Sequence, residues 1–216
     1  FTTLHSGGKF SDKVYTSSAG LHGVGASVTN ALSEWLEVTV FKHGQIHRMR
    51  FENGGNLTVP LEVIGNTRKT GTLIRFKPDA KIFSTVDFKW DTISSRLRES
   101  AFLLKNVRFV IKDERSGNEQ EYFYTDGLKE YVGALNQNKT PIGPIIMFED
   151  YSNDIKVEAA LQYCSNDYNE NIYSYANNVR TKDGGTHETG FRTGITRAVN
   201  DFAKENNLLR IKNSTL

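Results

Sequence analysis

Three glycines lie close together in residues 20–26, whose order is Gly-Leu-His-Gly-Val-Gly-Ala, and a run with helical periodicity begins on the last glycine. A glycine-rich loop that leads into a helix can direct several backbone N–H groups at one point, and the helix dipole adds positive potential there. The expected ligand is a polyanion, such as the phosphates of a nucleoside triphosphate. Glycines that only relieve strain at a helix entry are the alternative, and the loop alone does not decide between the two.

A second glycine pair, Gly7-Gly8, precedes Lys9 in a polar segment without periodicity that covers the first 20 residues. Such a pair lets backbone approach a phosphate while the lysine ammonium neutralises its charge. A solvated turn with a surface lysine is the alternative. Tyr15 lies in the same segment, and its ring is suited either to packing or to covering a nucleotide base.

Several other kinds of site are not supported. The glycine order Gly-x-x-Gly-x-Gly, with no strand before it, is not the dinucleotide-binding fingerprint, and no P-loop ending Gly-Lys-Ser/Thr follows. The five histidines are scattered without metal-ligand spacing, and no Gly-x-Ser-x-Gly motif of serine hydrolases occurs. No carboxylate near the loop is marked as a general base. The sequence therefore predicts a phosphate-binding loop without acid–base groups beside it.

The composition is that of an ordinary globular protein, with 216 residues, 38% hydrophobic and 24% charged. A net charge of +2 gives no separate argument for nucleic-acid binding. No apolar run approaches the roughly 20 residues that span a bilayer, so no membrane partner is expected. The single cysteine, Cys164, excludes an internal disulfide and fits a reducing, cytoplasmic location, although a buried structural cysteine is equally common.

Periodicity and turn residues predict the elements that hold the glycine loop. A helix is expected from Gly25 to about Glu34, because apolar residues recur there at the spacing of one inward helix face: Val24, Val28, Ala31, Leu32 and Trp35. Strands with glycine-containing turns between them are expected at residues 36–40, 46–51, 57–63 and 72–76. The last of these, which begins at Thr72, is expected to be buried.

The rest of the chain is expected to continue as an α+β fold. Residues 87–104 and 127–136 are predicted helices, and residues 107–111 and 122–124 are predicted strands. The polar, proline-containing residues 136–144 are the best candidate for a linker, which places a domain boundary near Lys139. Beyond it, strands are expected at 145–148, 155–163 and 171–177, followed by a long helix capped by Thr186.

Four stretches, in this order, resemble the B subunits of bacterial type II topoisomerases: residues 4–10 (LHSGGKF), 20–25 (GLHGVG), 69–72 (KTGT) and 177–188 (NNVRTKDGGTHE). The resemblance covers essentially the whole chain. Residues 100–106 and 179–188 are more similar to the topoisomerase IV branch of this family than to the gyrase branch.

This resemblance implies a fold for each half of the chain. Residues 1–138 would be most of a Bergerat-type (GHKL) ATPase domain, an α/β sandwich that lacks its N-terminal part, with residues 1–20 as the ATP lid. Residues 139–216 would begin a transducer domain with a ribosomal S5 domain 2-like fold, lacking its C-terminal part. The chain would thus be an interior piece of a longer polypeptide, since residue 1 is phenylalanine and no terminating element ends it.

The resemblance also implies which residues contact ATP. Those expected to wrap its phosphates are Gly20, Leu21, His22, Gly23, Val24, Gly25 and Ala26. Gly7, Gly8 and Lys9 would belong to the lid, Tyr15 would reach the nucleotide from it, and Thr72 would lie beside the adenine. The catalytic glutamate and the Mg²⁺ ligands would lie outside these 216 residues, so the chain alone is expected not to hydrolyse ATP.

The expected partners of the whole protein are the topoisomerase A subunit, a second B subunit that joins on ATP binding, and double-stranded DNA. ATP binding and hydrolysis would drive dimerisation and passage of one duplex through another. Two other hypotheses stay open at this point. One is an ATP-gated chaperone or mismatch-repair clamp of the same ATPase superfamily, and the other is a remnant that keeps the fold without activity.

Overall fold

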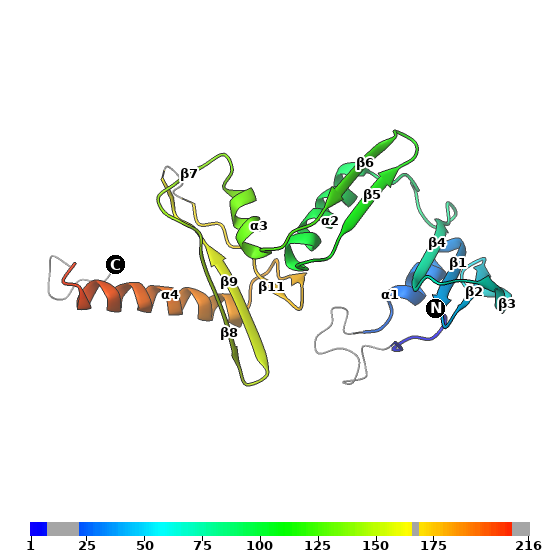
Figure 1. The fold of residues 1–216 in the computed structure, drawn as a ribbon, viewed down its shortest axis with the longest axis horizontal. Helices are drawn as coiled ribbons and strands as arrows, with labels where there is room; N and C mark the ends of the chain where they lie inside the picture. The colour runs from blue at the N-terminus through cyan, green and yellow to red at the C-terminus, as the bar shows by residue number, and fades with distance from the viewer. Residues whose placement is uncertain (8–21, 166–168, 209–216) are drawn as a thin grey trace. The chain divides into compact units, whose positions relative to one another are not determined.

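The computed structural model describes residues 1–7, 22–165 and 169–208, which are the coloured parts of Figure 1. The chain forms two compact units, Phe1–Trp90 and Asp91–Leu216, which are described separately below. The division after Trp90 lies inside the first expected domain. The predicted boundary near Lys139 stays a prediction.

The first unit is built on a four-stranded antiparallel sheet with the strand order β3-β2-β1-β4 (Figure 1). Its strands are β1 (Ser33–Lys42), β2 (Gln45–Glu52), β3 (Asn56–Asn66) and β4 (Gly71–Pro78). The β1–β2 turn contains His43 and Gly44, both with positive φ (52° and 79°), which suits a two-residue hairpin between right-twisted strands. The four predicted strands of this unit are confirmed.

The core of the first unit lies on one face of this sheet. Leu36 and Val38 of β1 and Phe51 of β2 are buried, and Phe1, Val40 and Met49 pack against them. Alternate residues of a strand point to the same face, which brings Leu36 and Val38 together. The predicted burial of residues 72–76 is wrong, because Leu73, Ile74 and Phe76 are each more than 40% exposed. β4 is an edge strand with one neighbour, and a short apolar run does not specify what covers it.

Helix α1 (Gly25–Ala31) follows the glycine loop but ends earlier than predicted, because β1 already begins at Ser33. The predicted inward face is also wrong. Val28 is 44% exposed and Ala31 is exposed, whereas Ser27 and Asn30 are buried. Their side chains donate hydrogen bonds to two carbonyl oxygens of the N-terminal segment, Ser27 to Thr3 (3.0 Å) and Asn30 to Phe1 (3.1 Å). Buried polar side chains are normally hydrogen-bonded, and these two bonds allow Ser27 and Asn30 to occupy the buried face in place of apolar residues.

The second unit contains three further helices and eight short strands among its described residues (Figure 1). Its helices are α2 (Trp90–Leu103), α3 (Leu128–Leu135) and α4 (Thr186–Glu205). Antiparallel pairs join β5 (Phe109–Asp113) with β6 (Asn118–Tyr122), β7 (Thr140–Pro141) with β10 (Cys164–Ser165), β8 (Ile146–Ser152) with β9 (Ile155–Leu161), and β11 (Tyr175–Ala176) with β12 (Val179–Arg180). No helix of the described residues is long and apolar enough to span a membrane.

Three predictions about the second unit need correction. The strand expected at 122–124 lies earlier, because β6 runs from Asn118 to Tyr122. The strand expected at 171–177 is confined to the two residues of β11, because residues 171–174 have no ladder partner. Thr186 is the first helical residue of α4 and does not cap it. The N-cap is Gly185, which has no side chain to bond the first turn.

Aromatic residues join α2 and α3 in the core of the second unit. Ala101 and Phe102 of α2 are buried, and the Phe102 ring stacks on Tyr124 (centroids 3.8 Å apart) and on Tyr131 of α3 (4.9 Å). α3 in turn lies against β8 and β9. These stacks fix α3 against α2, since offset aromatic pairs add to the free energy gained from burial.

Candidate functional site

The described part of the glycine loop is open at the start of α1. Gly23 has a positive φ of 63°, Val24 is the N-cap residue, and the helix begins at Gly25. The N–H of Val28 donates to the carbonyl of Val24 (2.8 Å), so the preceding N–H groups of the first turn have no acceptor within the helix. Val24 makes no side-chain cap. The start of α1 therefore presents backbone N–H donors that are not hydrogen-bonded by a capping side chain.

The start of α1 also has open space beside Gly25. A Cβ atom built on Gly25 meets no atom of the described residues within 4 Å, and His22 and Ala26 are exposed. Gly7, the described part of the expected lid, has a φ of 126° and equally open surroundings. The donors of the first turn of α1 are thus accessible from outside.

The other expected nucleotide contacts are only partly described. Gly8, Lys9, Tyr15, Gly20 and Leu21 lie outside the described residues. Thr72 lies at the exposed start of β4, opposite Val40 of β1, and no hydrogen bond among the described residues joins it to residues 22–26. A single ATP site that contains all the expected residues therefore stays a prediction.

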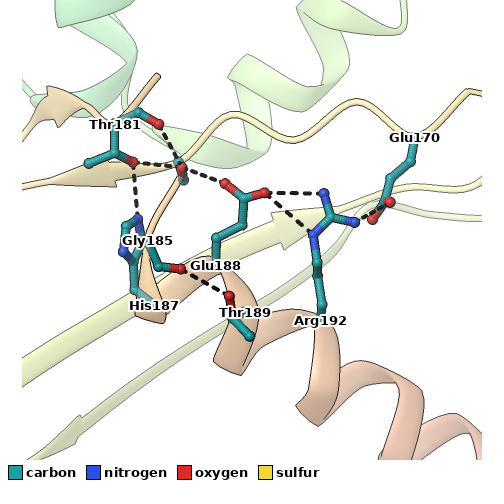
Figure 2. Close-up of polar contacts among 8 residues, drawn as sticks. Glu170, Thr181, Gly185, His187, Glu188, Thr189 and Arg192 are labelled. Carbon is teal, nitrogen blue, oxygen red and sulfur yellow. Dashed lines mark hydrogen bonds and ion pairs between the residues drawn. The ribbon is translucent and has the colours of Figure 1, made fainter. Parts of the chain in front are cut away.

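A second polar arrangement lies at the start of α4, where Figure 2 shows side chains converging from α4 and from the segment before it. The Ser174 hydroxyl is 2.6 Å from the Thr181 hydroxyl and donates to the Glu188 carboxylate (3.1 Å). The Thr181 hydroxyl is 3.0 Å from Nε2 of His187. Arg192, one turn along α4, pairs with Glu188 (3.1 Å) and with Glu170. We call these six residues the α4 polar cluster.

Two glycines make this cluster possible. Gly184 has a φ of 72°, and a Cβ there would lie 3.4 Å from Oε2 of Glu188. Gly185 has a φ of 157°, and a Cβ there would lie only 2.8 Å from two ring atoms of His187. Larger residues would therefore displace the imidazole and crowd the carboxylate. The stretch Gly-Gly-Thr-His-Glu therefore begins with two glycines because the side chains of His187 and Glu188 lie where their Cβ atoms would be.

The charges in the cluster are mutually compensated. Hydrogen bonds from Arg192 and then Ser174 lower the pKa of Glu188, and bonds to Glu170 and Glu188 raise the pKa of Arg192. The cluster residues other than His187 line a polar depression of about 440 Å³, together with Arg180, Lys182 and neighbouring residues. A carboxylate that stays ionised and paired is unsuited to moving a proton near neutral pH. The arrangement is suited to holding the segment before β11 against α4.

Sequence reasoning missed part of this cluster. Thr181, His187 and Glu188 belong to a stretch that carried the family resemblance, but they had no assigned role, and Glu170, Ser174 and Arg192 were not singled out. The available signal was the glycine pair directly before a long helix. Among the described residues, no three His, Cys, Asp or Glu side chains are grouped so as to hold a metal ion.

Comparisons with known proteins give a consistent result. A family model described as DNA gyrase B matches residues 127–216. The B subunit of DNA topoisomerase 4 from Streptococcus pneumoniae is 50% identical over all of this chain, and that from Bacillus subtilis is 49% identical. The chain spans about a third of the length of these relatives (34% and 33%).

A solved structure is also similar to this chain. It is the 43K ATPase domain of Thermus thermophilus gyrase B in complex with an aminocoumarin, with a TM-score of 0.79 and 38% sequence identity. The match covers 88% of this chain and 52% of that one.

Proposed function

Because this chain belongs to the family of bacterial type II topoisomerase B subunits, we propose that it is part of the ATP-driven portion of a topoisomerase IV B subunit. The observation that carries this proposal is the identity of about 50% over the whole chain with subunits of that name. The similarity to a gyrase B ATPase domain supports a GHKL-type ATPase fold within residues 1–138. A ribosomal S5 domain 2-like transducer in residues 139–216 is part of the same proposal.

In this proposal, backbone groups of residues 20–26 bind the ATP phosphates. The uncapped first turn of α1 and the open space at Gly25 support it, because N–H groups at a helix start stabilise negative charge without a bulky side chain. Gly7, Gly8 and Lys9 close over the nucleotide, Tyr15 contacts it, and Thr72 lies beside the adenine. Binding and hydrolysis of ATP would supply the free energy for association and separation of the two B subunits. No group of acidic side chains among the described residues is placed to hold Mg²⁺, and its ligands would lie outside this chain.

In the whole protein, which would act in the cytoplasm, ATP at this site would control a gate formed by two B subunits. ATP binding would bring two B subunits together around a DNA duplex, and hydrolysis would separate them again. The A subunit would cleave and reseal the second duplex. The 216 residues alone would not hydrolyse ATP, because the family resemblance implies that the catalytic glutamate lies outside them.

Nucleotide binding is tested by titrating a nonhydrolysable ATP analogue into the B subunit, extended to the length of its relatives, by calorimetry. Gly25→Ala should weaken binding at least about tenfold, which corresponds to ~1.4 kcal/mol, because its Cβ would enter the phosphate loop. Gly190→Ala is the matched control, since Gly190 is a helical glycine of α4 with equally open surroundings. Absence of binding by the wild type, or equal binding by Gly25→Ala, would overturn this assignment.

The reaction is tested separately with the A subunit present. ATP-dependent unlinking of interlocked DNA circles is expected. ATP hydrolysis without any change in DNA linkage would instead favour the chaperone or clamp hypothesis. The topoisomerase relatives reported above favour the first outcome.

A further inference from the structure

Two adjacent residues, Ser174 and Tyr175, make hydrogen bonds to different helices of the second unit. The Ser174 hydroxyl bonds Glu188 of α4 through the polar cluster. The Tyr175 hydroxyl donates to Glu99 of α2 (2.5 Å) and lies 3.1 Å from the hydroxyl of Tyr131 of α3. Successive side chains of an extended chain point to opposite sides, so these two residues connect α4 with α2 and α3.

The contact between Tyr175 and Glu99 is a strong one. The Glu99 side chain is 17% exposed and also pairs with Arg96 (2.7 Å). Burial opposes ionisation of Glu99, but the hydrogen bonds from Tyr175 and Arg96 outweigh it and lower its pKa. Burial, and then the bond to Glu99, raise the pKa of Tyr175. The phenol therefore donates to a carboxylate throughout the neutral range, and such charge-assisted bonds are stronger than neutral ones.

Aromatic contacts beside Tyr175 also connect α2 and α3 with the segment that contains Tyr175. Tyr131 of α3 stacks on Phe102 of α2, and Tyr173 lies 6.0 Å from the Tyr131 ring. The Arg180 guanidinium of β12 lies over Tyr173 at 4.7 Å. A shift of α2 or α3 would thus act on residues 173–175 at several points.

Other contacts hold α2 and α3 to β9 independently of Tyr175. Lys105, just after α2, pairs with Glu158 of β9, and Asn136, just after α3, bonds Gln162 (3.1 Å). Gly127 leaves room for the Lys105 stem, since a Cβ there would lie 2.5 Å from Cε of that lysine. Loss of the Tyr175 hydroxyl therefore leaves this second connection in place.

We propose that Tyr175 is a positioning residue that couples ATP turnover to DNA passage, by linking α2 and α3 to α4 through its bond to Glu99. The proposal rests on the function proposed above, in which α2 and α3 belong to the nucleotide-binding domain and α4 to the domain that follows it. Tyr175 is not one of the residues expected to contact ATP. Its effect should therefore appear in coupling and not in nucleotide binding.

The test uses the complete B subunit assembled with its A subunit and measures the ATP hydrolysed per DNA passage event. Tyr175→Phe removes only the hydroxyl. It should keep the DNA-independent rate of ATP hydrolysis, while the ATP consumed per passage event rises about two- to thirtyfold, the usual range for a contact on a coupling path. Glu99→Gln should act in the same direction with a smaller effect, because an amide oxygen still accepts the phenol. This second variant also tests the proposal if Tyr175→Phe does not fold.

Tyr122→Phe is the matched control. Its hydroxyl bonds Ser94 of the same helix α2, also at 2.5 Å, but both residues lie within the first expected domain. An unchanged ratio in Tyr175→Phe, or an equal rise in Tyr122→Phe, overturns the inference while leaving the proposed function intact. A wild-type protein that neither hydrolyses ATP nor passes DNA overturns both.

Discussion

A Cβ atom on Gly185 would lie 2.8 Å from Nδ1 and Cε1 of His187, so the imidazole occupies the space that any larger residue would need. Nε2 of the same ring lies 3.0 Å from the Thr181 hydroxyl. The backbone at Gly185 (φ 157°) is also one that other residues rarely adopt. Gly185 is thus required both for its conformation and for its small size.

Gly185→Ala should lower the free energy of unfolding by ~1–3 kcal/mol, because backbone strain adds to the loss of the His187–Thr181 bond. Urea denaturation measures this change. Gly190→Ala, in the same unit but inside α4 and without neighbours, should instead raise the free energy of unfolding by ~0.5–1 kcal/mol. A neutral Gly185→Ala would contradict the steric explanation.

Gly127→Ala should destabilise the chain by at least ~1–2 kcal/mol, the cost of a Cβ at a left-handed φ of 58°. The new methyl group would also displace the Lys105 stem from its path to Glu158. A double-mutant cycle with Lys105→Ala, followed by urea denaturation, should show a coupling energy of at least ~0.5 kcal/mol. Strict additivity would show that the two sites are independent.

Asn30→Asp should destabilise the first unit by more than ~3 kcal/mol. Asn30 is 1% exposed and donates to the carbonyl oxygen of Phe1, so a carboxylate there would be buried, unpaired and facing an acceptor. Ser27→Ala on the same face of α1 removes one neutral hydrogen bond and should cost only ~1 kcal/mol. Thermal unfolding of the two variants compares these costs, and similar values would contradict the account of a buried polar face.

Hydrogen bonds from Arg192 and then Ser174 should hold the pKa of the Glu188 carboxyl below that of an unpaired glutamate, and a side-chain NMR titration measures it. Because the folded pKa is lowered, the stability that Glu188 contributes is present above its unfolded pKa and is lost as the pH falls through the folded pKa. Arg192→Gln should raise the pKa of Glu188, since Arg192 is the main cause of the shift. Arg197→Gln, which removes a pair with Asp201 further along α4, should leave it unchanged. The opposite pattern would contradict the assigned pairing.

Local sequence was sufficient for the strands and turns of the first unit. Alternating side chains set the period of β1 and β2, and His43-Gly44 and Asn53-Gly54 supply the positive φ values that their turns need. The same reasoning placed the long helix α4 and the start of α1 after the glycine loop, because spacing within one segment carries this information.

The partners of polar residues were decided only by the tertiary structure. Ser27 and Asn30 turn inward because carbonyls of Phe1 and Thr3 lie there, and nothing in the helical pattern indicates them. Tyr175 meets Glu99 across 76 residues of sequence, and Ser174 meets Glu188 across a glycine-lined turn. The sequence alone predicted most of the elements and the family, since these depend on neighbours along the chain. Hydrogen-bond partners depend on which distant atoms are brought within about 3 Å, and only the folded chain specifies that.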